Sequence, residues 1–403
     1  MALTGTPEDR ALVEIHDMAF EVVEAHPEAV FRVRVGGGLG RTPILGPIIK
    51  DRLSWKDLLT YTHAVMRVFN ELGRRDNLTK ARIKILVRAV GAEKFSEMVE
   101  EEWSRLRDGI HQLTQTELDR VKQSFVEPDW THGQQLDNLH EQFEGEKRRQ
   151  FNHWLKRNRL AHRQSGYAAV LIPLKDTKRA PGDATSAEMD EIAAIADKFS
   201  QGYIRVSHTQ DFILPAVIES DLPELYLALK AINLHHAVGG LIGAMVACPG
   251  GDFCALANAR SLPVAEDIAT RYTSLDAQEN IGPLDLRISG CMNSCGHHHV
   301  GHIGILGVDK DGAAFYQLLL GGHSGHGAPA ALGTIIGRAF AEDEIGDAVE
   351  EVIDTYLEQR LDGESFREAV GRLGKQVFAT AADNIRKPVS RDEAHDAEHG
   401  ASV

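Results

Sequence analysis

The sequences ISGCMNSCG at residues 288–296 and ACPGGDFCA at residues 247–255 hold all four cysteines of this 403-residue chain. The cysteines are spaced as C-x5-C and C-x3-C, at Cys248, Cys254, Cys291 and Cys295. A disulfide-stapled secreted domain is small and spreads its cysteines along the whole chain. Four cysteines confined to one part of a long chain instead predict a single four-thiolate metal site in a reducing compartment.

Four thiolates bind either zinc or an iron–sulfur cluster. Zinc ribbons favour C-x2-C knuckles, whose short turn lets two sulfurs chelate one small ion. The wider spacing in this chain favours a cluster, whose iron atoms lie apart, while zinc and unliganded thiols remain alternatives. Pro249-Gly250-Gly251, inside the first pair of cysteines, allows the backbone to turn closely around such a cluster.

The composition limits the class of protein. With 43% hydrophobic residues the chain can bury large cores, and its length predicts two or three domains. The net charge of −15 argues against general nucleic-acid binding, which needs a basic face. No apolar run reaches the roughly 18–20 residues of a membrane span, and residues 1–10 lack the basic and apolar regions of a secretory signal. We therefore expect a cytoplasmic protein that binds neither nucleic acid nor membrane.

The first domain is expected over residues 1–105. Thr6-Pro7-Glu8-Asp9 has the composition of a helix start, and apolar residues follow it at helical spacing as far as Val22. The stretch Val30–Val35 alternates between apolar and arginine side chains on its two faces, which predicts a strand. Ser54–Leu72 and the Lys- and Arg-rich segment that follows predict two further helices.

The remaining chain divides into four parts. Residues 106–160 are polar with scattered aromatic residues and predict a partly helical connection. Residues 161–234 predict the order β-α-β-β-α of a ferredoxin-like half-unit, with a capping box at Thr185-x-x-Glu188. The cysteine-bearing domain follows over residues 235–380, and residues 381–403 are expected to form a polar, disordered tail.

A weak internal repeat relates the first domain to the cysteine-bearing domain. The strand that ends in Gly36, Gly37 and Gly38 has a counterpart in Phe315–Gly322, about 285 residues later. Each strand is followed by a proline-containing loop and then by long amphipathic helices. The repeat suggests two related domains, of which only the second carries cysteines.

Five segments resemble the siroheme-dependent sulfite/nitrite reductase hemoprotein family. They are Ala247–Ala259, Ile288–His299, VGGGLGRTP from Val35, GRRDNLTKARIKILV from Gly73 and QSGYAAVLIPLK from Gln164. Their order along the chain makes the resemblance specific, and it extends to about residue 380. It implies an α+β fold in which a ferredoxin-like half-unit accompanies two related siroheme/4Fe–4S-type α/β domains.

The resemblance also implies the cofactors and the reaction. All four cysteines would hold a 4Fe–4S cluster, and Cys295 would also bridge through its sulfur to the siroheme iron. The expected activity is the six-electron reduction of sulfite to sulfide, with reduction of nitrite to ammonia as the alternative. The electron donor would be a ferredoxin or a flavoprotein reductase.

The resemblance begins late in the family's sequence. The family's first ferredoxin-like half, and a cationic segment that binds siroheme and the anion, have no counterpart before Met1. We therefore expect an N-terminally shortened member with impaired activity, arising from gene truncation, a misassigned start or a split enzyme. A further interpretation is a catalytically impaired remnant that binds the cluster and no longer holds siroheme.

Several cations are candidates for the siroheme pocket. Arg74, Arg75 and Lys80 could pair with the carboxylates of siroheme, because arginine offers a bidentate fork. The alternative is that they form a solvated helix start. Arg32 and Arg34 share one face of a strand and are equally compatible with a cofactor cavity or with solvent.

Small and polar residues near these segments are further candidates. Gly36, Gly37 and Gly38 would bring the backbone close to a carboxylate or a cofactor edge, or else form a tight turn. Asn293 is expected to bond near the siroheme ring or a cluster sulfide. The run His297–His299 suggests a metal site, but packing or hydrogen bonding beside a cluster that already has four thiolates is the better interpretation.

Overall fold

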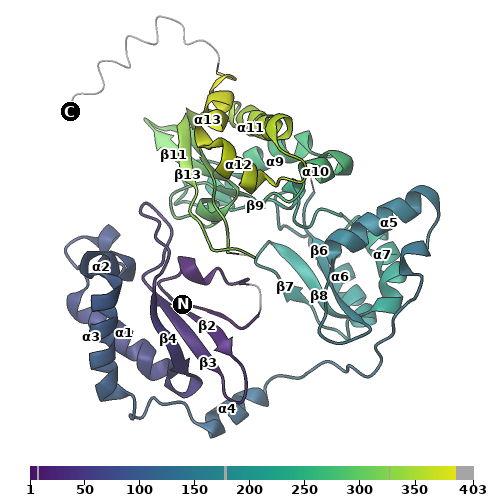
Figure 1. The fold of residues 1–403 in the computed structure, drawn as a ribbon. Helices are drawn as coiled ribbons and strands as arrows, with labels where there is room; N and C mark the ends of the chain where they lie inside the picture. Colours follow the sequence, from purple (N-terminus) through teal and green to yellow (C-terminus); the bar gives the residue numbers. More distant parts are fainter. Residues whose placement is uncertain (7–8, 177–178, 326, 387–403) are drawn as a thin grey trace, which may run out of the picture.

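The computed structural model describes residues 1–6, 9–176, 179–325 and 327–386. Within these residues the strands form two four-stranded sheets and one five-stranded sheet, and each sheet has a hydrophobic core of its own. We name the three parts the N-terminal unit (β1 to α3), the middle unit (α5 to α7) and the C-terminal unit (β9 to α13). Figure 1 shows them arranged around a shared centre, near which the N-terminus lies.

The N-terminal unit is a sheet covered by helices, in the sheet order β1-β2-β3-β4. The bounds of its elements are β1 Ala2–Thr4, β2 Met18–Glu24, β3 Val30–Val35, β4 Ile48–Ser54, α1 Leu58–Leu72, α2 Ile83–Val90 and α3 Ala92–Leu106. The predicted strand β3 is confirmed, with Phe31, Val33 and Val35 buried on one face. The helix expected in the Ser54–Leu72 stretch is also confirmed, beginning at Leu58.

The helix expected between Thr6 and Val22 is wrong. Among the described residues of this stretch, the only helical element is a short 3-10 turn, Val13–Ile15. Met18–Glu24 is strand β2, paired antiparallel with β3 and parallel with β1. Pro7 and Glu8, which suggested the helix start, lie outside the described residues. The carboxylate of Asp9 accepts hydrogen bonds from the backbone N–H groups of Ala11 and Val13, which stabilises a turn instead. Because β2 pairs with a strand on each side, it forms a strand although its apolar residues have helical spacing.

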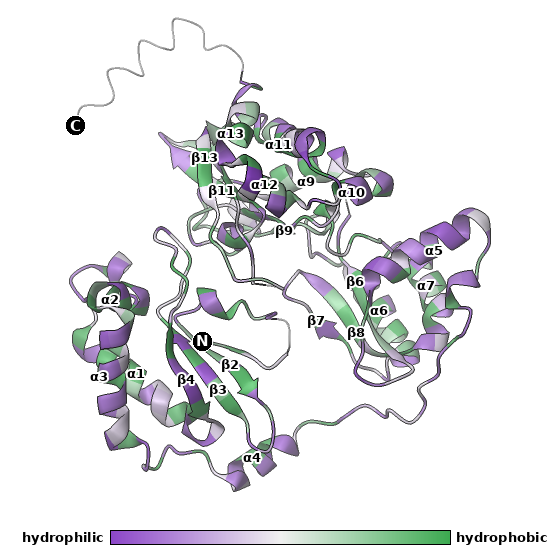
Figure 2. Ribbon diagram, in the orientation of Figure 1, coloured by the Kyte–Doolittle hydropathy of each residue, from purple (hydrophilic) through white to green (hydrophobic). Residues whose placement is uncertain are grey.

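The middle unit confirms the predicted order β-α-β-β-α. Its elements are α5 Gly145–Asn158, β5 Arg159–Leu160, β6 Tyr167–Pro173, α6 Ser186–Phe199, β7 Arg205–Val206, β8 Asp211–Ile218 and α7 Leu222–Ala231, with the sheet order β5-β6-β8-β7. Thr185 and Glu188 form the predicted capping box of α6. Helix α5 comes from the segment expected to be a connection, yet Phe151, Trp154 and Leu155 on it are part of the core. Figure 2 shows why sequence composition hides this, because α5 is mainly hydrophilic whereas β8 is mainly hydrophobic.

The C-terminal unit contains the cysteines, and its sheet has the order β13-β12-β11-β10-β9. Its strands are β9 Val246–Ala247, β10 Leu286–Ser289, β11 Ile303–Lys310, β12 Ala313–Leu320 and β13 Thr334–Phe340. Its helices are α8 Gly250–Phe253, α9 Leu262–Arg271, α10 Leu275–Ile281, α11 Ile345–Gln359, α12 Phe366–Leu373 and α13 Lys375–Asp383. Helix α4, Gln115–Lys122, lies in the segment that joins the N-terminal unit to the middle unit.

The N-terminal and C-terminal units are repeats of one another. Strands β1 to β4 correspond to β10 to β13, and in each set the first strand pairs parallel with the second while the others pair antiparallel. Helices α1 to α3 correspond to α11 to α13. Gly36 and Gly321 end equivalent strands with φ of 93° and 81°, and Gly91 and Gly374 join equivalent helices with φ of 88° and 80°. The internal repeat expected from the sequence is therefore confirmed.

A small apolar cluster joins the two repeats. Leu12 and Ile15 of the N-terminal unit are buried together with Val300 of the C-terminal unit, and Leu39, Leu45 and Leu332 pack against them. Ile15 and Val300 each end the short 3-10 turn that precedes the second strand of its repeat. The two units therefore meet through equivalent segments. No helix among the described residues has the length and apolar character needed to cross a membrane.

Candidate iron–sulfur site

Two parallel strands place the cysteine segments side by side. Strands β9 and β10 pair in parallel, with Ala247 opposite Ile288. Cys248 directly follows β9, and Cys291 lies two residues beyond the end of β10. Because parallel strands end at the same edge of a sheet, both cysteine segments begin at one place.

Backbone hydrogen bonds then tie the two segments to each other. The N–H of Cys248 donates to the carbonyl of Ile288, and the N–H groups of Asn258 and Ala259 both donate to the carbonyl of Gly290. In return, the N–H of Gly290 donates to the sulfur of Cys248, at 3.1 Å. These bonds fix the relative position of the C-x5-C and C-x3-C segments.

The four thiols lie within electrostatic reach of one another. Burial raises the pKa of the Cys295 thiol, and the neighbouring Cys248, Cys291 and Cys254 raise that pKa further. All four are free cysteines. Cys291 is buried, Cys248 and Cys254 are half-buried, and Cys295 is exposed, so that Cys295 is the thiol most accessible to a second group.

Glycines make room for this arrangement. Gly250 has a φ of 57°, and a Cβ added there would overlap with the hydroxyl of Ser261. A Cβ on Gly290 would lie 2.5 Å from the carbonyl oxygen of Ala259. Both positions therefore require glycine, so that the backbone can pass close to its neighbours. Four thiolates on such a close backbone fit the ligand set of a 4Fe–4S cluster.

The histidine run after Cys295 packs against the cysteine turn. His298 and His299 are buried, and their Nδ1 atoms lie 3.2 Å and 3.0 Å from the hydroxyl oxygen of Ser294. Burial lowers the pKa of His298 to about 2 and that of His299 to about 4. The pKa of His297 is lowered to about 4, by burial and then by the charge of Arg287. Among the described residues, no three His, Cys, Asp or Glu side chains are arranged to hold a single metal ion.

Two of the cations singled out after α1 contact residues of their own part of the chain. Arg74 pairs with Asp76, and Arg75 lies over the ring of Phe69, 4.9 Å from its centroid. Lys80 ends an exposed 3-10 turn. Their part in binding siroheme stays a prediction.

Arg32 and Arg34 are paired with carboxylates of their own unit. Arg34 lies 3.4 Å from Glu21 and 3.6 Å from Glu14, and it also donates to the carbonyl of Gly46. Arg32 lies 3.5 Å from Glu21. Asn293 is exposed in the turn between Cys291 and Ser294, and its role also stays a prediction.

The glycine segment surrounds a lysine that sequence reasoning did not single out. The buried Lys84 of α2 donates from Nζ to the carbonyls of Gly38, Leu39 and Thr42 at 2.7–3.3 Å. Burial lowers its pKa, as does the charge of Arg82. A Cβ on Gly37 would overlap with the carbonyl of Glu14, and a Cβ on Gly38 would lie 2.9 Å from Arg82. The only signal for Lys84 in the sequence was its place in the GRRDNLTKARIKILV segment.

The same glycine segment reaches the cysteine turn. Arg41 lies 3.4 Å through Nε from the sulfur of Met292, and a Cβ on Gly40 would lie 3.5 Å from the Met292 carbonyl oxygen. Met292 directly follows Cys291. The N-terminal unit therefore lies against the cysteine turn, even though it supplies no cysteine.

Arg287 was also missed. It lies on β10, is 4% exposed, and donates from Nε to both carboxylate oxygens of Asp285 at 3.0 Å and 2.8 Å. Its charge acts on His208 of the middle unit as well as on His297. Gln210, close to His208 in the chain, bonds to both backbone groups of Ala247. The cysteine loops therefore lie where all three units meet.

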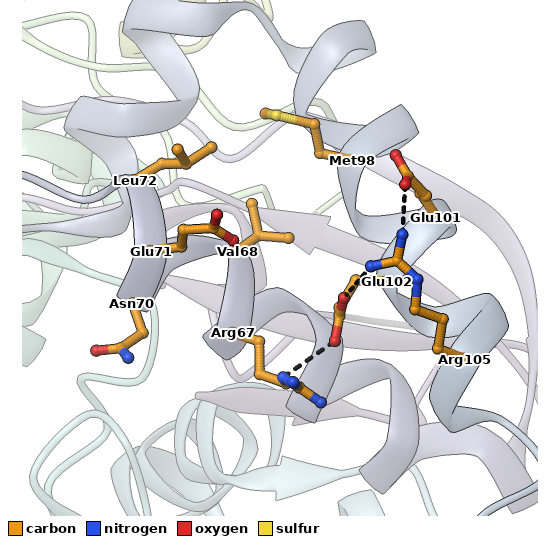
Figure 3. Close-up of a pocket in the computed structure, with 9 residues that line it drawn as sticks. All are labelled: Arg67, Val68, Asn70, Glu71, Leu72, Met98, Glu101, Glu102 and Arg105. Atoms are coloured by element: carbon orange, nitrogen blue, oxygen red, sulfur yellow. Dashed lines mark hydrogen bonds and ion pairs between the residues drawn. The ribbon is translucent and has the colours of Figure 1, made fainter.

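A separate groove lies between α1 and α3 of the N-terminal unit. Figure 3 shows its lining: Arg67, Val68, Asn70, Glu71, Leu72, Met98, Glu101, Glu102 and Arg105. Both arginines are paired, Arg67 with Glu102 and Arg105 with Glu101 and Glu102. None of the cysteines or siroheme-pocket candidates lines it. The groove therefore does not belong to the cysteine site.

Comparison with protein families agrees with this geometry. The family described as the nitrite and sulphite reductase 4Fe-4S domain matches residues 1–106 and 239–393, which together are more than half of the chain. The two matched segments contain the two repeats. The chain belongs to the nitrite/sulfite reductase family. The ferredoxin-like half-domain of nitrite and sulfite reductases matches residues 171–232, within the middle unit.

Some of the relatives are named as sulfite reductases and others as nitrite reductases. Sulfite reductase [ferredoxin] 1 of Mycolicibacterium paratuberculosis is 28% identical over 88% of this chain and 58% of its own length. The assimilatory ferredoxin-dependent nitrite reductase of Haloferax mediterranei is 25% identical over 98% of this chain and 64% of its own length. The chain thus spans about three-fifths of the length of these relatives.

A solved structure has the same fold. The NirA protein of Mycobacterium tuberculosis aligns with a TM-score of 0.65 and 24% identity, over 93% of this chain and 61% of that one. This agreement establishes the α+β architecture with its ferredoxin-like half-unit.

Proposed function

We propose that this chain carries the cofactor-binding part of a siroheme- and 4Fe–4S-dependent reductase that converts sulfite to sulfide. The observation that carries the proposal is the set of four free thiols, on two segments joined by backbone hydrogen bonds, where the three units meet. Cys248, Cys254, Cys291 and Cys295 would bind the cluster. Cys295, the exposed thiol, would also bridge to siroheme.

The chain's own residues would hold and enclose these groups. When bound, the cluster and siroheme would supply the electrons for reduction of an oxyanion. The loops after β9 and β10 position the thiolates, and neutral His298 and His299 hold the turn before Cys295 through Ser294. Arg287, held by Asp285, contributes positive charge where the units meet, which suits a site that must accept an anion.

Reduction of nitrite to ammonia is the second candidate, because relatives named as sulfite reductases and relatives named as nitrite reductases match this chain at similar identity. The proposed electron donor is a ferredoxin, since relatives named for either substrate are also named for ferredoxin. A flavoprotein reductase is the alternative donor.

The first experiment measures the cofactors directly. Anaerobically purified or reconstituted protein should contain about four iron and four acid-labile sulfide per chain. Siroheme would add a Soret band and a red-region band, whereas a cluster alone gives only a broad shoulder. Stoichiometric zinc without sulfide would refute the cluster, and a cluster without siroheme bands would support the remnant interpretation.

The second experiment distinguishes the role of Cys295 in binding the cluster from its proposed role as a bridge to siroheme. Cys295→Ser should abolish reduction of sulfite and nitrite by reduced viologen or ferredoxin, even in preparations that retain part of the cluster, because serine oxygen replaces the bridging sulfur. Relative rates with sulfite and nitrite in the unmodified protein then decide between the two substrates. Substantial reduction by the Cys295→Ser variant would remove Cys295 from this role.

A further inference from the structure

Ser261 has an unusual hydrogen-bonding arrangement for its position. It precedes the first residue of α9, where a serine side chain normally accepts a hydrogen bond from a backbone N–H in the first turn. The Ser261 side chain makes no such bond, and its φ of −107° and ψ of −29° are helical rather than extended. Its hydroxyl instead lies 3.3 Å from the sulfur of Cys248, its only hydrogen-bond partner among the described residues.

The surroundings of Ser261 hold the hydroxyl in this place. The residue is fully buried. A Cβ on Gly250 would overlap with the Ser261 hydroxyl oxygen, and a Cβ on Gly290 would lie 3.1 Å from it. Two glycines, one in each cysteine segment, therefore leave a niche that a small hydroxylated side chain fills.

The chemistry of a cysteine ligand determines the direction of this bond. In a free thiol, either the sulfur or the hydroxyl oxygen could donate. A metal-bound cysteine is a thiolate and has no proton, so Ser261 must then donate to it. The N–H of Gly290 donates to the same sulfur at 3.1 Å. In the described part of the chain, the sulfurs of Cys254 and Cys291 accept no hydrogen bond, and the sulfur of Cys295 interacts only with its own backbone N–H.

We propose that Ser261 is a positioning residue that raises the reduction potential of the cluster by donating a hydrogen bond to Cys248. The inference rests on the proposed cluster and goes beyond it. Hydrogen bonds to ligand sulfurs withdraw negative charge, so they stabilise the reduced cluster, which carries one more electron. Because Cys248 alone receives two donors, it is the ligand through which the polypeptide biases the cluster.

The test compares Ser261→Ala with a matched control. Ser274→Ala removes a serine at the start of α10 whose hydroxyl accepts from Ala277 and contacts no cysteine. At a fixed ambient potential, Ser261→Ala should lower the ratio of reduced to oxidised cluster about tenfold, which equals 59 mV for one electron. Ser274→Ala should leave this ratio unchanged. An unchanged ratio in Ser261→Ala with full iron and sulfide content would overturn the inference.

A measurement on the unmodified protein guards against a variant that assembles no cluster. The iron–thiolate stretching bands should shift between H2O and D2O, because exchangeable protons on Ser261 and Gly290 contact one ligand sulfur. Bands insensitive to deuterium would also overturn the inference. Unmodified protein that lacks iron and sulfide would instead refute the proposed cluster itself, so the two failures are distinguishable.

Discussion

The turn before Cys295 depends on two neutral histidines. Ser294 has a φ of 60°, in the left-handed region, and its hydroxyl contacts the Nδ1 atoms of both His298 and His299. A hydroxyl has one proton, so at least one of the two rings must donate through Nδ1. Protonation of both rings would place two charges side by side in a buried position, with ring centroids 4.0 Å apart. The conformation of the cysteine turn is thereby linked to pH.

We predict that acid destabilises the chain through His298. Its pKa is about 2 in the folded protein, against about 6.5 when unfolded. The unfolded state binds the proton first, so stability is complete above pH 6.5 and is lost as the pH falls below that value. Between pH 7 and 5 the loss should be about 2 kcal/mol. Urea unfolding at the two pH values measures it.

The control for this prediction is a histidine in solvent. His298→Gln should reduce the pH dependence, whereas His132→Gln should not, because the His132 side chain is 73% exposed. An equal pH dependence in all three proteins would show that the acid sensitivity arises elsewhere.

At the scale of elements, α2 holds the glycine segment through one side chain. The amine of Lys84 donates to the carbonyls of Gly38, Leu39 and Thr42. The Gly38 carbonyl also accepts from the N–H of Ile44, whereas Lys84 is the only donor to the other two carbonyls among the described residues. Lys84→Met would leave the carbonyls of Leu39 and Thr42 without a donor. A buried group that loses its partner costs roughly 1–3 kcal/mol. We expect a loss of about 2–3 kcal/mol and faster amide exchange over residues 36–46.

Arg88→Ala is the matched control for Lys84→Met, because Arg88 is an exposed cation on the same helix. It should change stability by less than about 0.5 kcal/mol. Amide exchange in the glycine segment that is as slow in Lys84→Met as in Arg88→Ala would contradict the role of Lys84.

Glu279 of helix α10 pairs with two cations of α5. Glu279 accepts from Arg157 at 2.6 Å and from Lys156 at 2.7 Å, and its pKa is lowered to about 2, mainly by the hydrogen bond from Arg157. Its side chain is only 17% exposed. Glu279→Gln removes the negative charge and leaves a partly buried arginine unpaired. We predict a loss of about 1–2 kcal/mol, measured by urea unfolding.

An exposed ion pair between the same two helices provides the comparison for Glu279→Gln. Asp276 pairs with Arg149 at 3.4 Å, and both side chains are more than half exposed. Asp276→Asn should therefore cost less than about 0.5 kcal/mol. Equal effects of the two substitutions would mean that burial of Glu279 adds nothing.

At the scale of the whole molecule, the two repeats are joined at the small cluster of Ile15 and Val300. Val300→Ala should cost about 1–2 kcal/mol, because it leaves a cavity where the units meet. Combined with Ile15→Ala, its effect should deviate from the sum by at least about 0.5 kcal/mol, since residues in one cluster couple.

Val349 on α11 provides a control for this coupling, because it is fully buried in a different cluster of the C-terminal unit. Val349→Ala and Ile15→Ala should add within about 0.5 kcal/mol. Additivity of Val300→Ala with Ile15→Ala as well would show that the repeats fold independently of this contact.

Sequence alone determined the features that depend on neighbouring residues. The alternation in Val30–Val35 and the capping box at Thr185 are local patterns, and the four cysteines needed only their spacing to indicate a metal site. The tertiary structure decided the rest. The apolar residues before Val22 fit either the spacing of a helix or the alternation of a strand, and pairing with β1 and β3 made them a strand. Lys84 contacts Thr42, which lies 42 residues away in the chain. Ser261 contacts Cys248, which lies 13 residues away. Their roles were hidden because a hydrogen bond depends on distance in space, which only the folded chain establishes.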